Sequence, residues 1–282
     1  MRRDVLDGYH PLVVFIYFAM VIIASVVLFH PLASAVSLAA ALLYGIWLKG
    51  MKAVKYFILP LAVAAVTLLV NTLFVHQGIT VIAYMGENPI TREAVIYGLC
   101  AGLMTGSMLM WFYCAGCIMT SDKFIYIFGR IMPAASLMFS MTMRFVPRFA
   151  GQAGKISAAR RAMGCSDGRK TASGLKTVSV MATWALENSI DTADSMKARG
   201  YGRRGRSRYA IFRWEPRDIL LLVICTCLTV CALASNIRIV CYPMVRLSGS
   251  AAGLPAFAVL CLIPLAMNVW EGMRWKYLQS KI

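Results

Sequence analysis

The stretch from Leu12 to Phe29 reads LVVFIYFAMVIIASVVLF and holds no charged residue. A helix of about 17–25 mostly apolar residues is long enough to cross the hydrocarbon core of a membrane. Five further uncharged apolar stretches share this character: Leu32–Leu48, Tyr56–Phe74, Ala94–Met119, Ile219–Ala234 and Leu254–Trp270. The sequence therefore predicts six membrane-spanning helices, four before a long middle segment and two after it.

The composition of the chain agrees with this prediction. Of its 282 residues, 60% are hydrophobic and 15% are charged. Soluble domains are typically about 45–50% apolar and about 25% charged, and disordered chains are poorer still in apolar residues. A soluble enzyme and a disordered chain are both excluded, and the fold class is predicted to be an all-α polytopic membrane protein.

The net charge of +17 is compatible with a sided membrane protein or with nucleic-acid binding, so its distribution must decide. If the N-terminus is placed inside, the outer segments hold only Arg92, Arg238 and Arg246, and the inner segments hold the other 26 Lys and Arg. This split follows the positive-inside rule. It predicts cytoplasmic N- and C-termini, and it predicts that nucleic acid is not a partner.

Met1-Arg2-Arg3 followed by an apolar run, with Ala33-Ser34-Ala35 beyond it, resembles a cleavable signal peptide. The apolar part of such a peptide is usually 7–15 residues long, and this run is longer. An uncleaved first span is therefore favoured. The nine cysteines predict no disulfide framework, because most of them lie within the predicted spans. Six of these are expected to pack as small hydrophobic side chains: Cys100, Cys114, Cys117, Cys225, Cys227 and Cys231.

The chain divides into residues 1–119 with four spans, residues 120–214 as a cytoplasmic domain, and residues 215–282 with two more spans. Residues 120–217 contain 18 of the 29 basic residues together with many apolar ones, a mixture typical of amphipathic helices. Helices are predicted over Lys123–Ile131, Pro133–Met163 and Ala172–Arg199. Pro147 is expected to bend the second helix, because it cannot donate a backbone hydrogen bond.

Two faces of the helix over Ala172–Arg199 can be assigned from its spacing. Glu187, Asp191 and Asp194 share one face and predict either a solvated surface or pairing with bases of the neighbouring helix. The first alternative is the more common one. An apolar stripe lies on another face of this helix and is formed by Leu175, Val178, Met181, Ala182 and Ala185.

The two long helices of the middle segment end alike. One ends in Ala162-Met163-Gly164 after Arg160 and Arg161, and the other in Ala198-Arg199-Gly200. An arginine at such a position can interact with the helix dipole, or it can project its five donors toward a partner. Two similar ends on one domain favour docking.

Met143-Arg144-Phe145-Val146-Pro147 and the run from Ser195 to Tyr201 carry a resemblance to a known family. They resemble the Arg-Phe-hydrophobic-Pro motif and the second Ala-Arg-Gly motif of the transmembrane (T) component of energy-coupling factor (ECF) transporters, the EcfT/CbiQ family. The first Ala-Arg-Gly motif of that family falls on Ala162-Met163-Gly164, where methionine replaces arginine.

The resemblance implies a non-catalytic subunit in the cell (inner) membrane of a prokaryote. It implies that two ABC-type ATPases, which bind ATP and Mg²⁺, dock on the ends of long coupling helices, and that this chain itself binds no cofactor or metal. It also implies a membrane-embedded substrate-binding (S) component that takes up a vitamin or a transition-metal ion. The ATPase-contacting residues would be Ala198, Arg199, Gly200, Arg160, Arg161, Ala162, Met163 and Gly164, with a coupling-helix kink at Arg144 and Pro147.

Gly98, Gly102 and Gly106 form a GxxxGxxxG ridge on the fourth predicted span. Such a ridge allows the close approach of another helix. That helix could belong to this chain or to the S component, and packing within the chain is favoured.

Two other functions remain as alternatives. A membrane anchor or scaffold could bind anionic lipid or an unrelated protein through its basic segments, such as Tyr201–Arg208. A secondary transporter is disfavoured, because such proteins place ionisable residues inside the membrane and the six predicted spans hold none. The nearest match to a P-loop, Gly164–Thr171, has the wrong glycine spacing, so ATP would be bound by partners.

Overall fold

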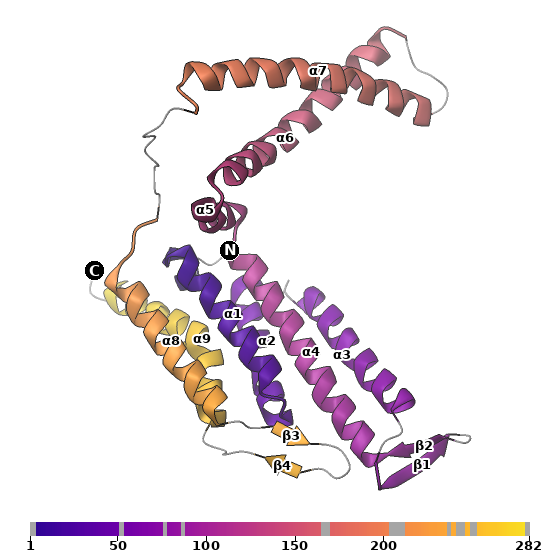
Figure 1. Cartoon of the computed structure of the whole chain (residues 1–282), viewed down its shortest axis with the longest axis vertical. Helices are drawn as coiled ribbons and strands as arrows, with labels where there is room; N and C mark the ends of the chain where they lie inside the picture. The colour runs from indigo at the N-terminus through magenta and orange to yellow at the C-terminus, as the bar shows by residue number, and fades with distance from the viewer. Residues whose placement is uncertain are drawn as a thin grey trace. The chain divides into compact units, whose positions relative to one another are not determined.

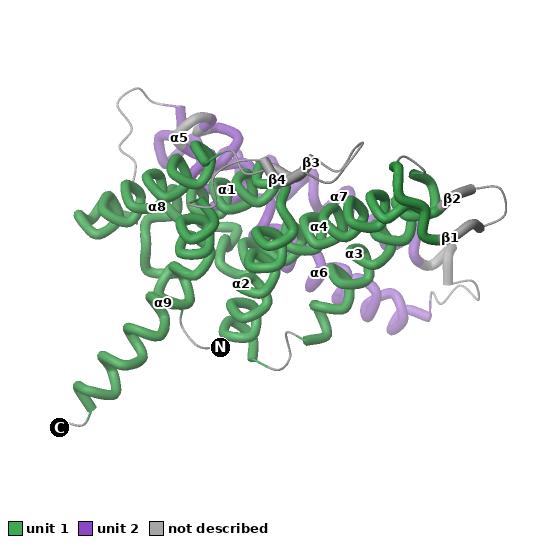
Figure 2. The backbone as a smooth tube through the Cα atoms, turned by 90° about the horizontal axis from the view of Figure 1, so that it is seen from below, with its two compact units in different colours: residues 1–123, 212–282 green, residues 124–211 purple. Residues whose placement is uncertain are grey.

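The computed structural model describes residues 4–50, 54–75, 78–85, 88–164, 170–202, 212–235, 238–240, 246–248 and 253–279. The chain forms two compact units (Figure 2). Unit 1 comprises residues 1–123 and 212–282, and unit 2 comprises residues 124–211. The prediction of a cytoplasmic domain over residues 120–214 between two parts of a membrane domain stays a prediction.

Unit 1 contains a short 3₁₀ helix and six α-helices in its described residues: η1 (Val5–Gly8), α1 (Pro11–Val27), α2 (Pro31–Lys49), α3 (Val54–Phe74), α4 (Arg92–Ile118), α8 (Pro216–Ala234) and α9 (Gly253–Gln279). Five of them are at least 18 residues long and apolar enough to cross a membrane. The exception is α1, which is apolar but has 17 residues. That length lies at the lower limit for a spanning helix. The α-helical polytopic fold is confirmed, and α9 continues nine residues past its predicted end at Trp270.

The starts of α1 and α2 share the sequence His-Pro-Leu. In each case the histidine is the N-cap, and its Nδ1 accepts a hydrogen bond from the amide of the leucine, over 3.3 Å from Leu12 and 3.2 Å from Leu32. Proline occupies the first helical position, where its missing N–H costs nothing and its fixed φ suits a helix. These caps define both helix starts more sharply than the apolar pattern did.

The helices of unit 1 pack in a row (Figure 1). α3 packs on α4, α4 packs on α1 and α2, and α8 and α9 pack on each other and on α1 and α2. The centre of the core is the buried Trp111 of α4, whose Nε1 donates to Ser37 Oγ over 3.0 Å. Tyr17 and Tyr44 each place their ring 6.4 Å from that of Trp111. The core thus joins α1, α2 and α4.

Two short antiparallel hairpins were not predicted. β1 (Val81–Met85) pairs with β2 (Asn88–Thr91), and β3 (Arg238–Val240) pairs with β4 (Arg246–Ser248). Both lie at the same end of unit 1 (Figure 1), which we call the hairpin end. Three basic residues were assigned to the outer side from the sequence. Each begins an element at the hairpin end: Arg92 begins α4, Arg238 begins β3 and Arg246 begins β4. The opposite end, which carries η1, Lys123 and Trp214, we call the junction end.

The middle segment is helical as predicted. It forms α5 (Ser121–Ile131), α6 (Pro133–Ala162) and α7 (Lys170–Ala198), with boundaries within two residues of the predicted ones. α6 is one helix that continues through Pro147. The bend expected at this proline stays a prediction.

Candidate docking site at two helix ends

The end of α7 has a defined hydrogen-bond pattern. The amide of Gly200 donates to the carbonyl of Lys197 over 2.9 Å, and the amide of Tyr201 donates to the carbonyl of Met196 over 3.0 Å. Together these bonds form the Schellman motif, which satisfies carbonyls that a helix otherwise leaves open at its end. Gly200 has a φ of +82°, in the left-handed region that favours glycine. Arg199, directly before it, is the C-cap residue.

The described residues at the end of α6 share part of this pattern, the positive-φ glycine and its hydrogen bond. Gly164 has a φ of +71°, and its amide donates to the carbonyl of Arg161 over 3.1 Å. Met163 is the C-cap residue, so it occupies the position that Arg199 holds on α7. The likeness of the two helix ends, seen first in the sequence, is therefore also a likeness of backbone geometry.

The basic side chains at the two ends differ in their surroundings. Arg199 is exposed, whereas the exposed side chain at the equivalent position of α6 is Met163, at 69%. Arg160 turns toward α7, and its Nη1 donates to Thr177 Oγ1 over 3.0 Å. Arg161 is exposed and donates from Nε to the carbonyl of Ser157, one turn earlier in α6. Of the two arginines near Met163, Arg161 is the one directed toward solvent.

The two ends lie apart. α7 has 29 residues, a length of roughly 43 Å at 1.5 Å per residue. α6 ends shortly before α7 begins, so the end of α6 lies near the start of α7 and the two C-terminal ends lie at opposite ends of the crossed helix pair (Figure 1). The structure provides two similar but separate surfaces.

Aromatic contacts hold α6 and α7 together between these ends. The ring of Phe149 meets that of Trp184 edge-on at 5.5 Å, and the Arg148 guanidinium lies 5.7 Å from the centre of the same indole. Phe145 stacks on Phe149 one turn earlier. Arg144 and Pro147, the predicted kink residues, are exposed on α6 beside this contact.

The apolar stripe of α7 is not covered by α6. None of the side chains described in α6 and α7 is buried. Leu175 is 73% exposed and Val178 is 63% exposed, while Met181 and Ala185 of the same stripe are partly covered. Further large apolar side chains are also exposed on these helices: Met138, Phe139, Val146, Leu186 and Ile190. This much exposed apolar surface is typical of an interaction site.

The acidic row of α7 faces solvent. Glu187, Asp191 and Asp194 are all exposed. Asp194 pairs with Lys197 of its own helix at 3.6 Å, and both side chains are more than two-thirds exposed. Such surface pairs contribute little to stability. The solvated-surface interpretation of these acids is confirmed.

About a third of the chain is similar to known proteins. The chain is 32% identical over 100 residues to the energy-coupling factor transporter transmembrane protein EcfT 1 of Listeria monocytogenes serotype 1/2a, a match that covers 33% of this chain and 38% of the relative. It is 33% identical over 93 residues to EcfT of Lactobacillus helveticus, covering 31% and 34%, and 32% identical over 94 residues to EcfT of Listeria innocua, covering 31% and 36%. Over these segments the chain is similar to EcfT proteins.

The similarity of the chain to these EcfT proteins is partial. The aligned segments span little more than a third of the length of the relatives they match. No family model matches the chain.

The glycine ridge of α4 packs within the chain. A Cβ placed on Gly102 would lie 2.6 Å from the carbonyl oxygen of Ala64 in α3, and one on Gly98 would lie 3.1 Å from that of Leu68. Gly106 faces Ala64 and Pro60 of the same helix. The ridge allows α3 to approach α4 at backbone contact distance, so its partner is a span of this chain.

The described cysteines form no disulfide, and no group of three metal-ligating side chains occurs in the part of the chain that the structure describes. Cys100, Cys114 and Cys225 are buried as small hydrophobic residues should be. Cys227 and Cys231 are exposed on α8 and Cys117 is partly exposed, so the packing role expected for all six does not hold for these within the chain. Cys165 and Cys241 lie outside the described residues.

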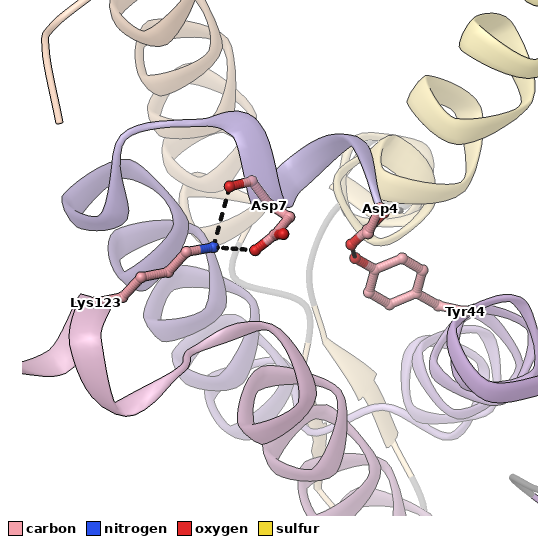
Figure 3. A network of polar contacts seen from close by, with 4 residues as sticks. All are labelled: Asp4, Asp7, Tyr44 and Lys123. Carbon is pink, nitrogen blue, oxygen red and sulfur yellow. Dashed lines mark hydrogen bonds and ion pairs between the residues drawn. The ribbon is translucent and has the colours of Figure 1, made fainter. Parts of the chain in front are cut away.

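A polar cluster at the junction end was not predicted from the sequence (Figure 3). The two oxygens of the Asp4 carboxylate accept hydrogen bonds from the hydroxyl of Tyr44 on α2 and the amide of Asn268 on α9. Lys123, in the first turn of α5, donates from Nζ to Asp7 Oδ1 over 2.6 Å and to the Asp7 carbonyl over 3.2 Å. Lys123 is only 4% exposed.

The same N-terminal segment also contacts the start of α8. The imidazole of His10 stacks on the indole of Trp214, with ring centres 4.1 Å apart, and the His10 amide lies 3.5 Å from Asp218 Oδ1. Asp218 is buried and closes a capping box with Glu215. The sequence carries one sign of this cluster, the single Lys123 shortly after an apolar span. Its partners could not be predicted, because they lie far apart along the chain.

Proposed function

We propose that this chain is the transmembrane coupling subunit of an ECF-type importer. The observation that carries the proposal is the pair of helix ends in unit 2, which share one backbone geometry and present exposed side chains, in a chain related to EcfT proteins. In this role the chain transmits the ATP-driven motion of two ATPase subunits to a membrane-embedded S component. Uptake of a vitamin or a transition-metal ion would then be determined by the S component.

The two helix ends supply two docking points of the same kind. An exposed arginine at a helix C-cap offers five N–H donors in a planar fork, which suits carboxylates or carbonyls of a partner. Arg199 has this placement on α7, and Arg161 is the nearest exposed arginine on α6. Because the ends are separated by about the length of a helix, each of two ATPase subunits could engage one of them. ATP and Mg²⁺ would be bound by these subunits and not by this chain.

The exposed apolar side chains of unit 2 and of α3 are suited to contact with lipid and with the S component. On α3, Ile58, Leu59 and Leu61 are each more than 60% exposed in the chain alone. Surfaces of this kind are stable only against lipid or another apolar protein surface. We assign them to the membrane and to the S component.

Anionic lipid is the third proposed partner. Beside the N-terminal segment, the end of α9 lines a cavity of about 690 Å³ with Arg217, Arg274, Trp270 and Trp275. Tryptophan and basic side chains together are typical of the level of lipid head groups. This placement supports a junction end on the cytoplasmic side of a prokaryotic membrane, with both termini cytoplasmic.

Co-purification from the native host tests the docking role. A tagged wild-type chain should retain ABC-type ATPase subunits in mild detergent, and Arg199→Glu should lose them, because the new carboxylate repels the acceptors that the arginine would bind. Lys155→Glu makes the same charge change on an exposed position of α6 away from both ends, and it should leave the complex intact.

The alternative function makes a different prediction. If the chain is a membrane anchor or scaffold, ATPase subunits will be absent from the wild-type preparation and Arg199→Glu will change only the binding of anionic lipid vesicles. Full retention of both ATPases by Arg199→Glu would count against the docking role of this residue.

A further inference from the structure

The N-terminal segment of residues 4–10 contacts unit 1 at the two places where the chain connects to unit 2. Lys123 is the last residue of unit 1 before unit 2, and residue 212 is the first residue of unit 1 after it. Asp7 binds Lys123, and His10 stacks on Trp214 and approaches Asp218. One short segment therefore contacts both points of unit 1 that lie next to its connections with unit 2.

The segment is itself fixed to the helix bundle by other contacts. Leu6 is 1% exposed, so its side chain is inserted in the core. Asp4 is bound by Tyr44 of α2 and Asn268 of α9, and the amide of Val5 donates to Asn268 Oδ1 over 3.2 Å. Residues 4–6 thus anchor the segment to the bundle, and residues 7–10 anchor Lys123 and Trp214 to the segment.

These polar and aromatic contacts define the position of the segment more narrowly than hydrophobic packing would. A buried ammonium loses its hydration, so Lys123 is tolerated at 4% exposure only because Asp7 supplies both a charge and a carbonyl. A polar pair of this kind fixes one geometry, whereas an apolar contact tolerates sliding. The position of Trp214 is fixed by ring stacking and by the capping box of α8.

We infer that residues 4–10 form a clasp that fixes the two points of unit 1 next to its connections with unit 2, Lys123 and Trp214, so that movement of unit 2 that reaches these points is passed to the helices of unit 1. This inference rests on the proposed coupling function. It assigns Asp7 and Lys123 as positioning residues, outside the ATPase-docking ends.

The test uses the wild-type complex with its ATPases and hydrogen exchange as the readout. ATP and Mg²⁺ should change amide exchange in unit 2 and also at the junction end of unit 1, in residues 4–10 and 212–218. In the double variant Asp7→Asn/Lys123→Met, the response in unit 1 should be lost while ATPase binding, ATP hydrolysis and the response in unit 2 remain. The double variant removes the pair without leaving a buried unpaired charge, so it is expected to fold.

Two further variants separate positioning from folding. Lys123→Arg keeps the charge and should keep the response of unit 1. Lys155→Met/Glu187→Gln removes one base and one acid from exposed positions and should behave as the wild type.

Each outcome is decisive. An unchanged nucleotide response of unit 1 in the double variant would overturn the clasp and leave the proposed function standing. Wild-type protein that carries no ATPase subunits would overturn the proposed function and the clasp with it.

Discussion

Gly164 and Gly200 determine how the two docking ends are built. Each residue adopts a positive φ and closes its helix with a hydrogen bond to a carbonyl of the last turn. An L-residue in this conformation costs about 1–2 kcal/mol. We predict that Gly200→Ala frays the end of α7 and weakens ATPase retention, whereas Gly174→Ala, in the interior of the same helix with open space around it, does not. Hydrogen exchange of the last turn of α7 measures the first effect directly.

The ends of α6 and α7 differ at the C-cap residue, which is Met163 on α6 and Arg199 on α7. Because Arg161 is the exposed arginine nearest to it, we predict that Arg161→Ala weakens the contact of α6 with its ATPase by about 2 kcal/mol, the cost typical of an interface hot spot. Adding Met163→Arg to that variant should restore binding, since it places an arginine at the position that Arg199 holds on α7. Titration of ATPase subunits onto the purified chain gives both affinities. A double variant no better than Arg161→Ala would show that position 163 is not a contact.

The N-cap of α1 predicts a pH dependence. Burial lowers the pKa of His10 below its usual 6.5, and the nearby Asp218 opposes this shift. The neutral ring accepts the hydrogen bond of the Leu12 amide at Nδ1, so the cap is fully present above pH about 6.5 and is lost as the pH falls through the lowered pKa. Wild-type protein should lose thermal stability over that range. The His10→Asn variant should show a smaller loss, because asparagine caps a helix without titrating there and only the equivalent cap at His30 still titrates. Thermal unfolding monitored from pH 7.5 to 5 compares the two.

The contact of α3 with α4 depends on small residues more than on apolar ones. The Cβ of Gly102→Ala would meet a backbone carbonyl oxygen of α3 at 2.6 Å, so the helices must separate, at a cost of about 1–3 kcal/mol. Gly116→Ala changes the same helix where nothing lies within 4 Å and should be neutral or stabilising. We expect a lower melting temperature in detergent for the first variant only. Equal melting temperatures would contradict the observed helix contact.

The helices could be predicted from the sequence because their signals are local. An uncharged apolar run specifies a span, and the glycines that end α6 and α7 specify a left-handed cap. The hairpins were missed because strands of three to five residues carry too little pattern to separate them from loops. The end of α9 was placed too early, because charged residues that follow Trp270 can continue the same helix beyond the apolar run.

The side-chain partners could not be predicted in the same way. Nothing near Asp4 in the sequence indicates Tyr44 or Asn268, and Lys123 is 116 positions from Asp7. The exposed stripe of α7 was predicted as a stripe, but only packing shows that α6 leaves most of it uncovered. Local patterns therefore predicted the candidate docking ends, and the clasp needed the tertiary structure.

The whole molecule combines a bundle of apolar helices with a unit whose long helices have no buried side chain among their described residues. A unit of that kind is completed by partners or by the membrane, since its exposed apolar surface is unfavourable in water. The two connections between the units are the only covalent route by which movement of one can reach the other. This arrangement fits the coupling function proposed for the chain.

Native mass spectrometry of the complex purified from its host tests the central claim most directly. The coupling function predicts a particle with one copy of this chain, two ABC-type ATPase subunits and one small membrane-embedded protein, and it predicts that Arg199→Glu lowers the number of ATPase subunits. A wild-type particle that contains this chain without any ATPase subunit would contradict the account.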